Sequence, residues 1–180
     1  MRKEIKVFPQ TVEAMKGTID TNIQKIKQMG EELRVMGNIG DGDMLDEALM
    51  HQIHREQELR HDQNNGLNFD LALIEVLSAS EVLDTSTVKQ GHRVKLEIKF
   101  ADGDKEIIFA TVGSTYDSSY LAESDTRFTS QEIMVSLETP LAQAIIGAPL
   151  NSVVTYRTDF DVHKVKVLNI EPSFLFNLQG

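Results

Sequence analysis

The chain contains no cysteine and no tryptophan, and only 6% of its 180 residues are aromatic. The absence of cysteine excludes disulfides and thiolate metal sites, and it is typical of proteins from a reducing compartment. No apolar run approaches the roughly 20 residues of a membrane helix, and the opening stretch MRKEIKVFPQ has no apolar signal core. We therefore expect a soluble, cytoplasmic protein with no membrane contact.

Positive charge is also scarce, because 18 Lys/Arg stand against 28 Asp/Glu and the formal net charge is −10. Residues 1–84 hold nine basic and sixteen acidic side chains, and residues 85–180 hold nine and twelve. A chain this acidic is a poor nonspecific binder of nucleic acid. Any contact with nucleic acid would have to be local, or made through a partner or a bridging metal.

Two long helical patterns fill the first half of the chain. From residue 11 to about residue 36, apolar residues recur at alternating steps of three and four, and Asn22 fills the one remaining position. This spacing is that of a heptad seam. A second pattern starts near Asp43 and has a polar middle, in which residues 64–66 (Asn-Asn-Gly) mark a possible interruption. Two such helices joined by a short turn predict an antiparallel coiled-coil hairpin whose arms bury each other's seams. The predicted seam residues are Val12, Met15, Ile19, Ile26, Met29, Leu33 and Met36, then Leu45, Leu49, Ile53, Leu67, Leu71, Ile74 and Leu77.

The pattern changes after Asp84 from helical spacing to alternation with a period of two. Strands are predicted at 94–100, 106–112, 132–137, 152–158 and 163–170, and residues 114–130 are predicted to be a polar loop. A short helix is bounded by Thr139 as N-cap, Pro140 at its first position and Gly147 beyond its end. The chain is thus predicted to be α+β, with a helical hairpin at 1–84 and a small antiparallel sheet domain at 85–180.

Acidic residues crowd the predicted turn of the hairpin, in the stretch GNIGDGDMLDEALMH. Close carboxylates raise each other's pKa unless a cation or solvent offsets the repulsion, so the turn is either solvated or metal-binding. A calcium-binding EF-hand is excluded, because Leu45 occupies a ligand slot and Asp46 the glycine slot. The acidic residues are Asp41, Asp43, Asp46 and Glu47.

Three histidines and two glutamates follow on one stripe of the second helix. His51 and His54, spaced i and i+3, could share a divalent metal with Glu47 or Glu58, and His61 continues the stripe. The alternative is an exposed polar stripe, which could respond to pH.

Two segments of the second half resemble a known family. VSLETPLAQAIIGAPLNSVVTYRT (135–158) resembles the C-terminal signature of the bacterial Gre transcript-cleavage factors, and SASEVLDTS (78–86) looks like their junction between coiled coil and globular domain. The resemblance implies an N-terminal coiled coil followed by a domain similar to FK506-binding proteins. It implies that the chain has no active site of its own and acts as a monomer on bacterial RNA polymerase, with nucleic acid contacted only in the elongation complex.

The resemblance also assigns roles to residues. The family's globular domain docks beside the secondary channel of the polymerase, and Glu138, Thr139, Pro140 and Leu141 match the docking segment. The hairpin enters the channel, and its acidic tip helps to hold the second catalytic Mg²⁺ and a water, which accelerates cleavage of backtracked RNA. The family's aspartate falls on Asp43 and its glutamate on Asp46, with Asp41 and Glu47 as additional acids.

The tip also departs from the family pattern. Asp46 is one methylene shorter than the family's glutamate, Glu47 replaces an asparagine, and residues 49–50 are Leu-Met where the family has Glu-Tyr. Three readings therefore stay open: a cleavage factor, a channel-occupying regulator without cleavage activity, or a non-catalytic coiled-coil interaction module.

Overall fold

The computed structural model describes residues 5–39, 44–100, 102–158 and 161–176. It divides the chain into two compact units: residues 1–12 together with 74–180, and residues 13–73. This division differs from the sequence-based boundary at residue 84, because residues 74–84 and the start of the chain are counted with the sheet. Within the described residues, no helix combines the length and apolar character that a membrane span requires.

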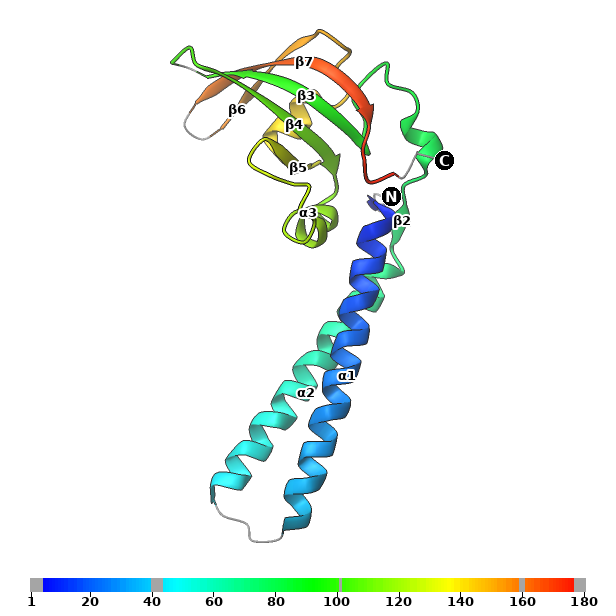
Figure 1. The fold of residues 1–180 in the computed structure, drawn as a ribbon, viewed down its shortest axis with the longest axis vertical. Helices are drawn as coiled ribbons and strands as arrows, with labels where there is room; N and C mark the ends of the chain where they lie inside the picture. Colours follow the sequence, from blue (N-terminus) through cyan, green and yellow to red (C-terminus); the bar gives the residue numbers. More distant parts are fainter. Residues whose placement is uncertain (1–4, 40–43, 101, 159–160, 177–180) are drawn as a thin grey trace. The chain divides into compact units, whose positions relative to one another are not determined.

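Helices α1 (Pro9–Ile39) and α2 (Met44–Leu71) lie side by side and antiparallel along residues 13–71 (Figure 1). Along α1, the residues at the predicted heptad positions are buried or half-buried, and Met15 and Met29 are the most enclosed of its apolar members. The neighbouring positions are almost all exposed. The seam of α1 is therefore confirmed, and it results from the period of its apolar residues.

The prediction for α2 was right at Ile53, Leu67 and Leu71 but wrong at Leu49. Leu49 is 45% exposed, whereas Met50 beside it is half-buried and belongs to the seam. The side chain of Leu45 lies outside the described residues. The polar middle belongs to that seam rather than interrupting it, and α2 runs unbroken through residues 64–66. Leu77, predicted as the last seam residue, instead lies in the core of the sheet-containing unit. The enclosed seam positions among the described side chains of α2 are Met50, Ile53, Gln57, Arg60, Asn64, Leu67 and Leu71, and Asp70 beside them is also half-buried.

A buried layer of polar side chains crosses this seam. The amide of Asn22 donates to Oδ1 of Asn64 over 2.9 Å, and Arg60 donates to Oδ1 of Asn22 over 3.0 Å. Gln57 donates to the backbone carbonyl of Ile26 over 3.1 Å. Such a layer fixes the register of paired helices, because any slip would leave buried amides without partners.

The second half forms a five-stranded sheet in the order β5-β4-β3-β7-β6 (Figure 1). Its strands are β3 (His92–Lys99), β4 (Lys105–Gly113), β5 (Glu132–Ser136), β6 (Val153–Arg157) and β7 (Val162–Pro172). Each predicted strand is present, but β4 and β5 pair in parallel, so the sheet is mixed rather than antiparallel. The chain is thus α+β, with a long helical region and a mixed sheet.

One face of the sheet is covered by the short helix α4 (Pro140–Ile145). Alternate residues of β3, Val94, Leu96 and Ile98, pack with Leu141 and Ile145 in the main core. Thr139 caps α4 as predicted, because its hydroxyl accepts from the backbone N–H of Ala142, and Gly147 follows the helix with φ of 78°. The alternation of β3 places its other side chains on the opposite face.

A second core joins segments that are far apart in the sequence. Strands β1 (Ile5–Val7) and β2 (Ile74–Val76) pair in parallel, and a 3-10 turn, η1 (Ala79–Val82), follows. The predicted polar loop contains a further helix, α3 (Thr115–Leu121), whose Leu121 enters this core. The core residues are Phe8, Leu77, Val82, Leu121, Leu175 and Phe176.

Candidate functional site

The predicted acidic tip spans the segment between the end of α1 at Ile39 and the start of α2 at Met44 together with the first turn of α2. Asp41 and Asp43 lie outside the described residues, as does the side chain of Asp46. Glu47 is in the first turn of α2 and is exposed. Acidic side chains at this end of a helix are favoured by the helix dipole, which offsets part of their mutual repulsion.

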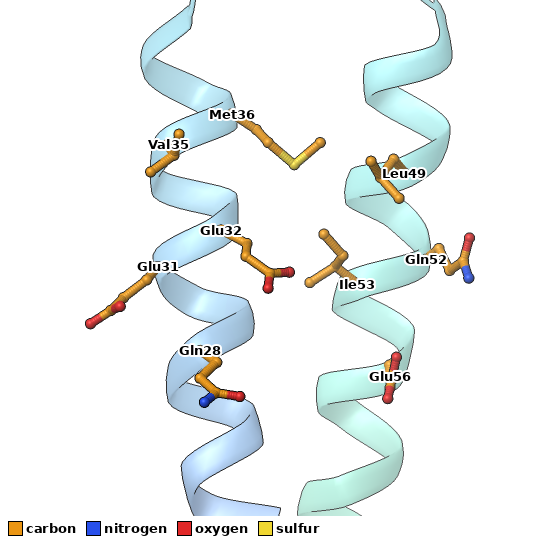
Figure 2. A pocket seen from close by; sticks show the side chains of 9 residues that line it. All are labelled: Gln28, Glu31, Glu32, Val35, Met36, Leu49, Gln52, Ile53 and Glu56. Atoms are coloured by element: carbon orange, nitrogen blue, oxygen red, sulfur yellow. The ribbon is translucent and has the colours of Figure 1, made fainter.

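A groove of about 680 Å³ lies between the two helices on the tip side of the polar layer (Figure 2). Met36 and Ile53 point toward each other across its floor, while Val35 and Leu49 stand at its sides, 55% and 45% exposed. The register of α2 explains the groove, because placing Met50 in the seam leaves Leu49 at its edge. Sequence reasoning missed this groove since it assigned Leu49 to the seam.

The rim of the groove is acidic. Glu31, Glu32 and Glu56 line it together with two glutamines, and no basic residue does. Glu56 is paired with Arg60 of the same helix over 2.6 Å. Glu31 and Glu32 have no ion pair among the described residues. The part of the hairpin nearest the tip therefore adds negative charge to the acids of the tip itself.

The histidine stripe is an exposed surface of α2. Glu47, His51, His54, Glu58 and His61 are all exposed. Within the described part of the chain, no three His, Asp or Glu residues are grouped closely enough to hold a metal ion. The arrangement supports the reading of a solvated polar stripe.

The predicted docking segment lies at the start of α4. Glu138 and Pro140 are exposed, whereas the side chain of Leu141 is in the main core and only 9% exposed. Thr139 is committed to capping, since its hydroxyl also donates to the carbonyl of Ser136. The surface that this segment offers to a partner is therefore made by Glu138 and Pro140.

A hollow of about 200 Å³ adjoins Glu138 and was not predicted from the sequence. It is lined by β1, by Gln90, by the start of α3, and by residues just before and within α4. The signal that could have located its α3 wall is the capping pattern Ser-x-x-Asp at 114–117. The lining residues are Ile5, Lys6, Gln90, Ser114, Thr115, Tyr116, Leu137, Glu138 and Gln143.

The most enclosed acid of the described chain, Asp117, holds this region together. Its carboxylate accepts from the backbone N–H groups of Phe8 and Ser114, over 2.9 and 2.7 Å, and from the hydroxyls of Thr11 and Ser114. Burial raises the pKa of Asp117, and these four donors oppose the shift. Gly113 leaves the space it needs, since a Cβ there would lie 2.9 Å from the Cβ of Asp117. Asp117 is thus a structural anchor for the first turns of both α1 and α3.

These features define an α+β protein with an antiparallel helix pair, an acidic end to that pair, and a mixed sheet. No family model and no curated protein matches the chain. Solved structures do match, over nearly its whole length. GreA factor homolog 1 (Gfh1) of Thermus thermophilus is 15% identical, covers 94% of this chain and 99% of its own, and gives a TM-score of 0.37.

Two further structures give similar values. Gfh1 of Thermus aquaticus is 17% identical over 93% of this chain and 98% of its own, with a TM-score of 0.38. The prokaryotic transcription elongation factor GreA/GreB from Nitrosomonas europaea is 11% identical over 94% of this chain and 99% of its own, with a TM-score of 0.32. The family that these structures represent is the one that residues 78–86 and 135–158 resemble.

Proposed function

We propose that the chain is a Gre-type transcription elongation factor. In this proposal the helix pair is a coiled coil that enters the secondary channel of bacterial RNA polymerase, and the sheet domain is FKBP-like and docks on the polymerase. The chain is not an enzyme; it stimulates the cleavage of backtracked RNA by the polymerase. The sequence motifs at 78–86 and 135–158 support this assignment.

The observation that carries the proposal is the self-contained burial of the helix pair. Seam residues of α1 and α2 enclose each other, and the amides of Asn22 and Asn64 satisfy each other within one chain. The described seam positions are thus occupied within one chain rather than left open to a second coiled coil, although Val35 and Leu49 stay exposed beside them. This favours a hairpin that works as an inserted arm over the reading of a coiled-coil adaptor.

The donor chemistry of the tip suits Mg²⁺, which prefers carboxylate oxygens and keeps several of its waters. Asp43 and Asp46 would hold the ion jointly with the polymerase, with Asp41 and Glu47 as nearby carboxylates. When bound, the ion would stabilise charge on the oxygens of the cleaved phosphodiester. The chain's own contribution would be to bring these carboxylates to the end of the arm.

Docking is proposed at the start of α4. Glu138 and Pro140 would contact the polymerase, Thr139 would hold the turn by capping, and Leu141 would fix it to the core. The hollow beside Glu138 gives this surface a depression into which a partner side chain could fit.

A second candidate function is a regulator that occupies the channel without stimulating cleavage. The altered tip favours it, because replacing glutamate by Asp46 shortens the side chain by one methylene. A displacement of about 1 Å at a catalytic group can cost roughly a hundredfold in rate. The acidic groove next to the tip adds further charge that is not needed to bind one ion.

RNA length in stalled complexes tests both candidates. Purified polymerase holding backtracked RNA is mixed with the protein and Mg²⁺, and shortening of the RNA is followed. Asp43→Asn and Asp46→Asn should each lower the cleavage rate by at least tenfold, whereas Asp62→Asn, at an exposed position remote from the tip in sequence, should not. Slower extension without shortening would support the second candidate. If the protein does not bind polymerase at all, both are refuted.

A further inference from the structure

The solvent-facing side of the five-stranded sheet gathers most of the positive charge of residues 85–180. Residues 85–180 contain nine Lys/Arg. Seven of them share this face, as the strand registers show, opposite the face that packs on α4. Within the described strands, three acids project among them: Glu97, Glu132 and Glu171. The seven basic residues are Arg93, Lys95, Lys99, Lys105, Arg157, Lys164 and Lys166.

Like charges stand directly opposite each other on this face. Lys99 of β3 is paired with Lys105 of β4 on one side and with Lys164 of β7 on the other, so three lysines form one row across three strands. Side chains at directly opposed positions have Cβ atoms about 4.5–5.5 Å apart, and like charges there destabilise a sheet. The next row adds Lys166 beside Glu97.

Acids of the described residues neutralise only part of this cluster. Glu97 is bonded to Lys105 over 3.0 Å, and Arg93 binds both Glu132 and Glu171. Among the described residues, Lys99, Lys164 and Lys166 have no ion pair. The nearby acids Asp102 and Asp104 lie in the turn between β3 and β4, beyond the end of the lysine row. A row of repelling lysines in which only Lys105 has an ion pair among the described residues is stabilised by a ligand that carries several negative charges.

We infer that this lysine face, defined by Lys95, Lys99, Lys105, Arg157, Lys164 and Lys166, binds the phosphate backbone of a single-stranded nucleic acid. This inference is independent of the proposed function, because it depends on the sheet alone. Successive outward side chains along a strand are about 6.6 Å apart and neighbouring strands about 4.8 Å apart. The face is therefore a grid of charges that a flexible polyphosphate chain can follow.

The composition of the face favours nucleic acid over an acidic protein segment. Protein interfaces are depleted in lysine and depend on apolar or aromatic anchors, whereas nucleic-acid interfaces are polar and strongly positive. Here the large aromatic side chain, Phe109, is covered by the guanidinium of Arg93, 3.9 Å from its ring centre. The exposed aliphatic residues of this face lie near its edges: Ile107 and Val153 at the two ends of the Glu97 row, and Val162 opposite Arg157 at the start of β7.

Fluorescence anisotropy with a labelled 20-nucleotide oligo(dT) tests the inference over a salt range from about 50 to 200 mM. Each phosphate neutralised on a single strand contributes about 0.7 to the slope of log K against log salt. The double variant Lys164→Gln/Lys166→Gln should therefore reduce the slope by about 1.4 and weaken binding at the lowest salt on the order of tenfold or more. Its melting temperature at low salt should not fall, because the substitution relieves repulsion.

The matched control is Lys25→Gln/Lys27→Gln, which changes the net charge equally at exposed positions of α1. It should leave the slope within about 0.3 of the wild-type value if the sheet face is the binding site. Equal losses in the two double variants would overturn the inference, since the effect would then be one of net charge. Tighter binding of a poly-glutamate peptide than of oligo(dT) would also overturn it, in favour of an acidic protein partner.

Discussion

Asp117→Ala should destabilise the sheet-containing unit strongly. Asp117 has no exposed surface, and its carboxylate accepts four hydrogen bonds. Alanine would leave the backbone N–H groups of Phe8 and Ser114 buried without an acceptor. The hydroxyls of Thr11 and Ser114 cannot take over as acceptors for both N–H groups. Each unsatisfied buried donor costs about 1–3 kcal/mol, so the expected loss is about 2–6 kcal/mol. That is a large share of the roughly 5–15 kcal/mol that stabilises a typical domain.

Urea unfolding followed by far-UV circular dichroism would measure this loss, since the chain has no tryptophan. Asp117→Asn keeps the shape of the side chain and one carbonyl acceptor, so it should fall between the wild type and Asp117→Ala. Glu123→Ala, at an exposed position just after α3, should change the free energy of unfolding by less than about 0.5 kcal/mol. A loss below about 1 kcal/mol for Asp117→Ala would refute the reasoning, because the two N–H groups would then have found other partners.

Two further predictions concern buried polar groups. His92 is buried and neutral, since its Nδ1 accepts from the backbone N–H of Lys89 and its Nε2 bonds the backbone carbonyl of Val82. Burial lowers the pKa of His92. The contribution of His92 to the free energy of unfolding is therefore present above pH 6.5 and is lost as the pH falls below that value. Melting temperatures from about pH 7.5 to 5.5 should show this loss in the wild type and in His54→Gln but less of it in His92→Gln, and identical profiles would contradict it. Asn64→Leu should lower the stability of the helix pair by about 1–3 kcal/mol, and adding Asn22→Leu should recover part of that loss. A double variant that is less stable than the single one by thermal melting would refute the second prediction.

The helix pair shows which features the sequence could reveal. The seam of α1 was predictable because its apolar residues keep the heptad period, with one polar residue in one slot. In α2, the slots at Gln57, Arg60 and Asn64 are polar, so too few apolar residues carry the pattern to decide which residue precedes Ile53 in the seam. The choice of Leu49 instead of Met50 followed from that. Only the cross-helix hydrogen bonds, which no single-helix pattern records, determine the true seam.

The strands were predictable for a similar local reason, since Val94, Leu96 and Ile98 alternate with charged residues. The parallel pairing of β4 and β5 was not, because pairing depends on the route of the connection and not on either strand. The anchor at Asp117 was missed because its partners Phe8 and Thr11 are more than 100 residues away. Its only local signal was the capping pattern with Ser114. The metal-binding role of Asp41, Asp43 and Asp46 remains a prediction from the sequence.

Because β1 and β2 are paired in parallel, the two helices form the connection between neighbouring strands. Ile5 is in register with Ile74, so everything from residue 8 to residue 73 is a single crossover connection between two neighbouring strands. Such a connection can change in length without altering the strands it joins. Removing one heptad from each helix, on the tip side of the Asn22–Asn64 pair, would shorten the arm by about 10 Å, at 1.5 Å per residue, while keeping the register. The reach of the arm is therefore an adjustable quantity, set by the number of heptads and separable from the fold that carries it.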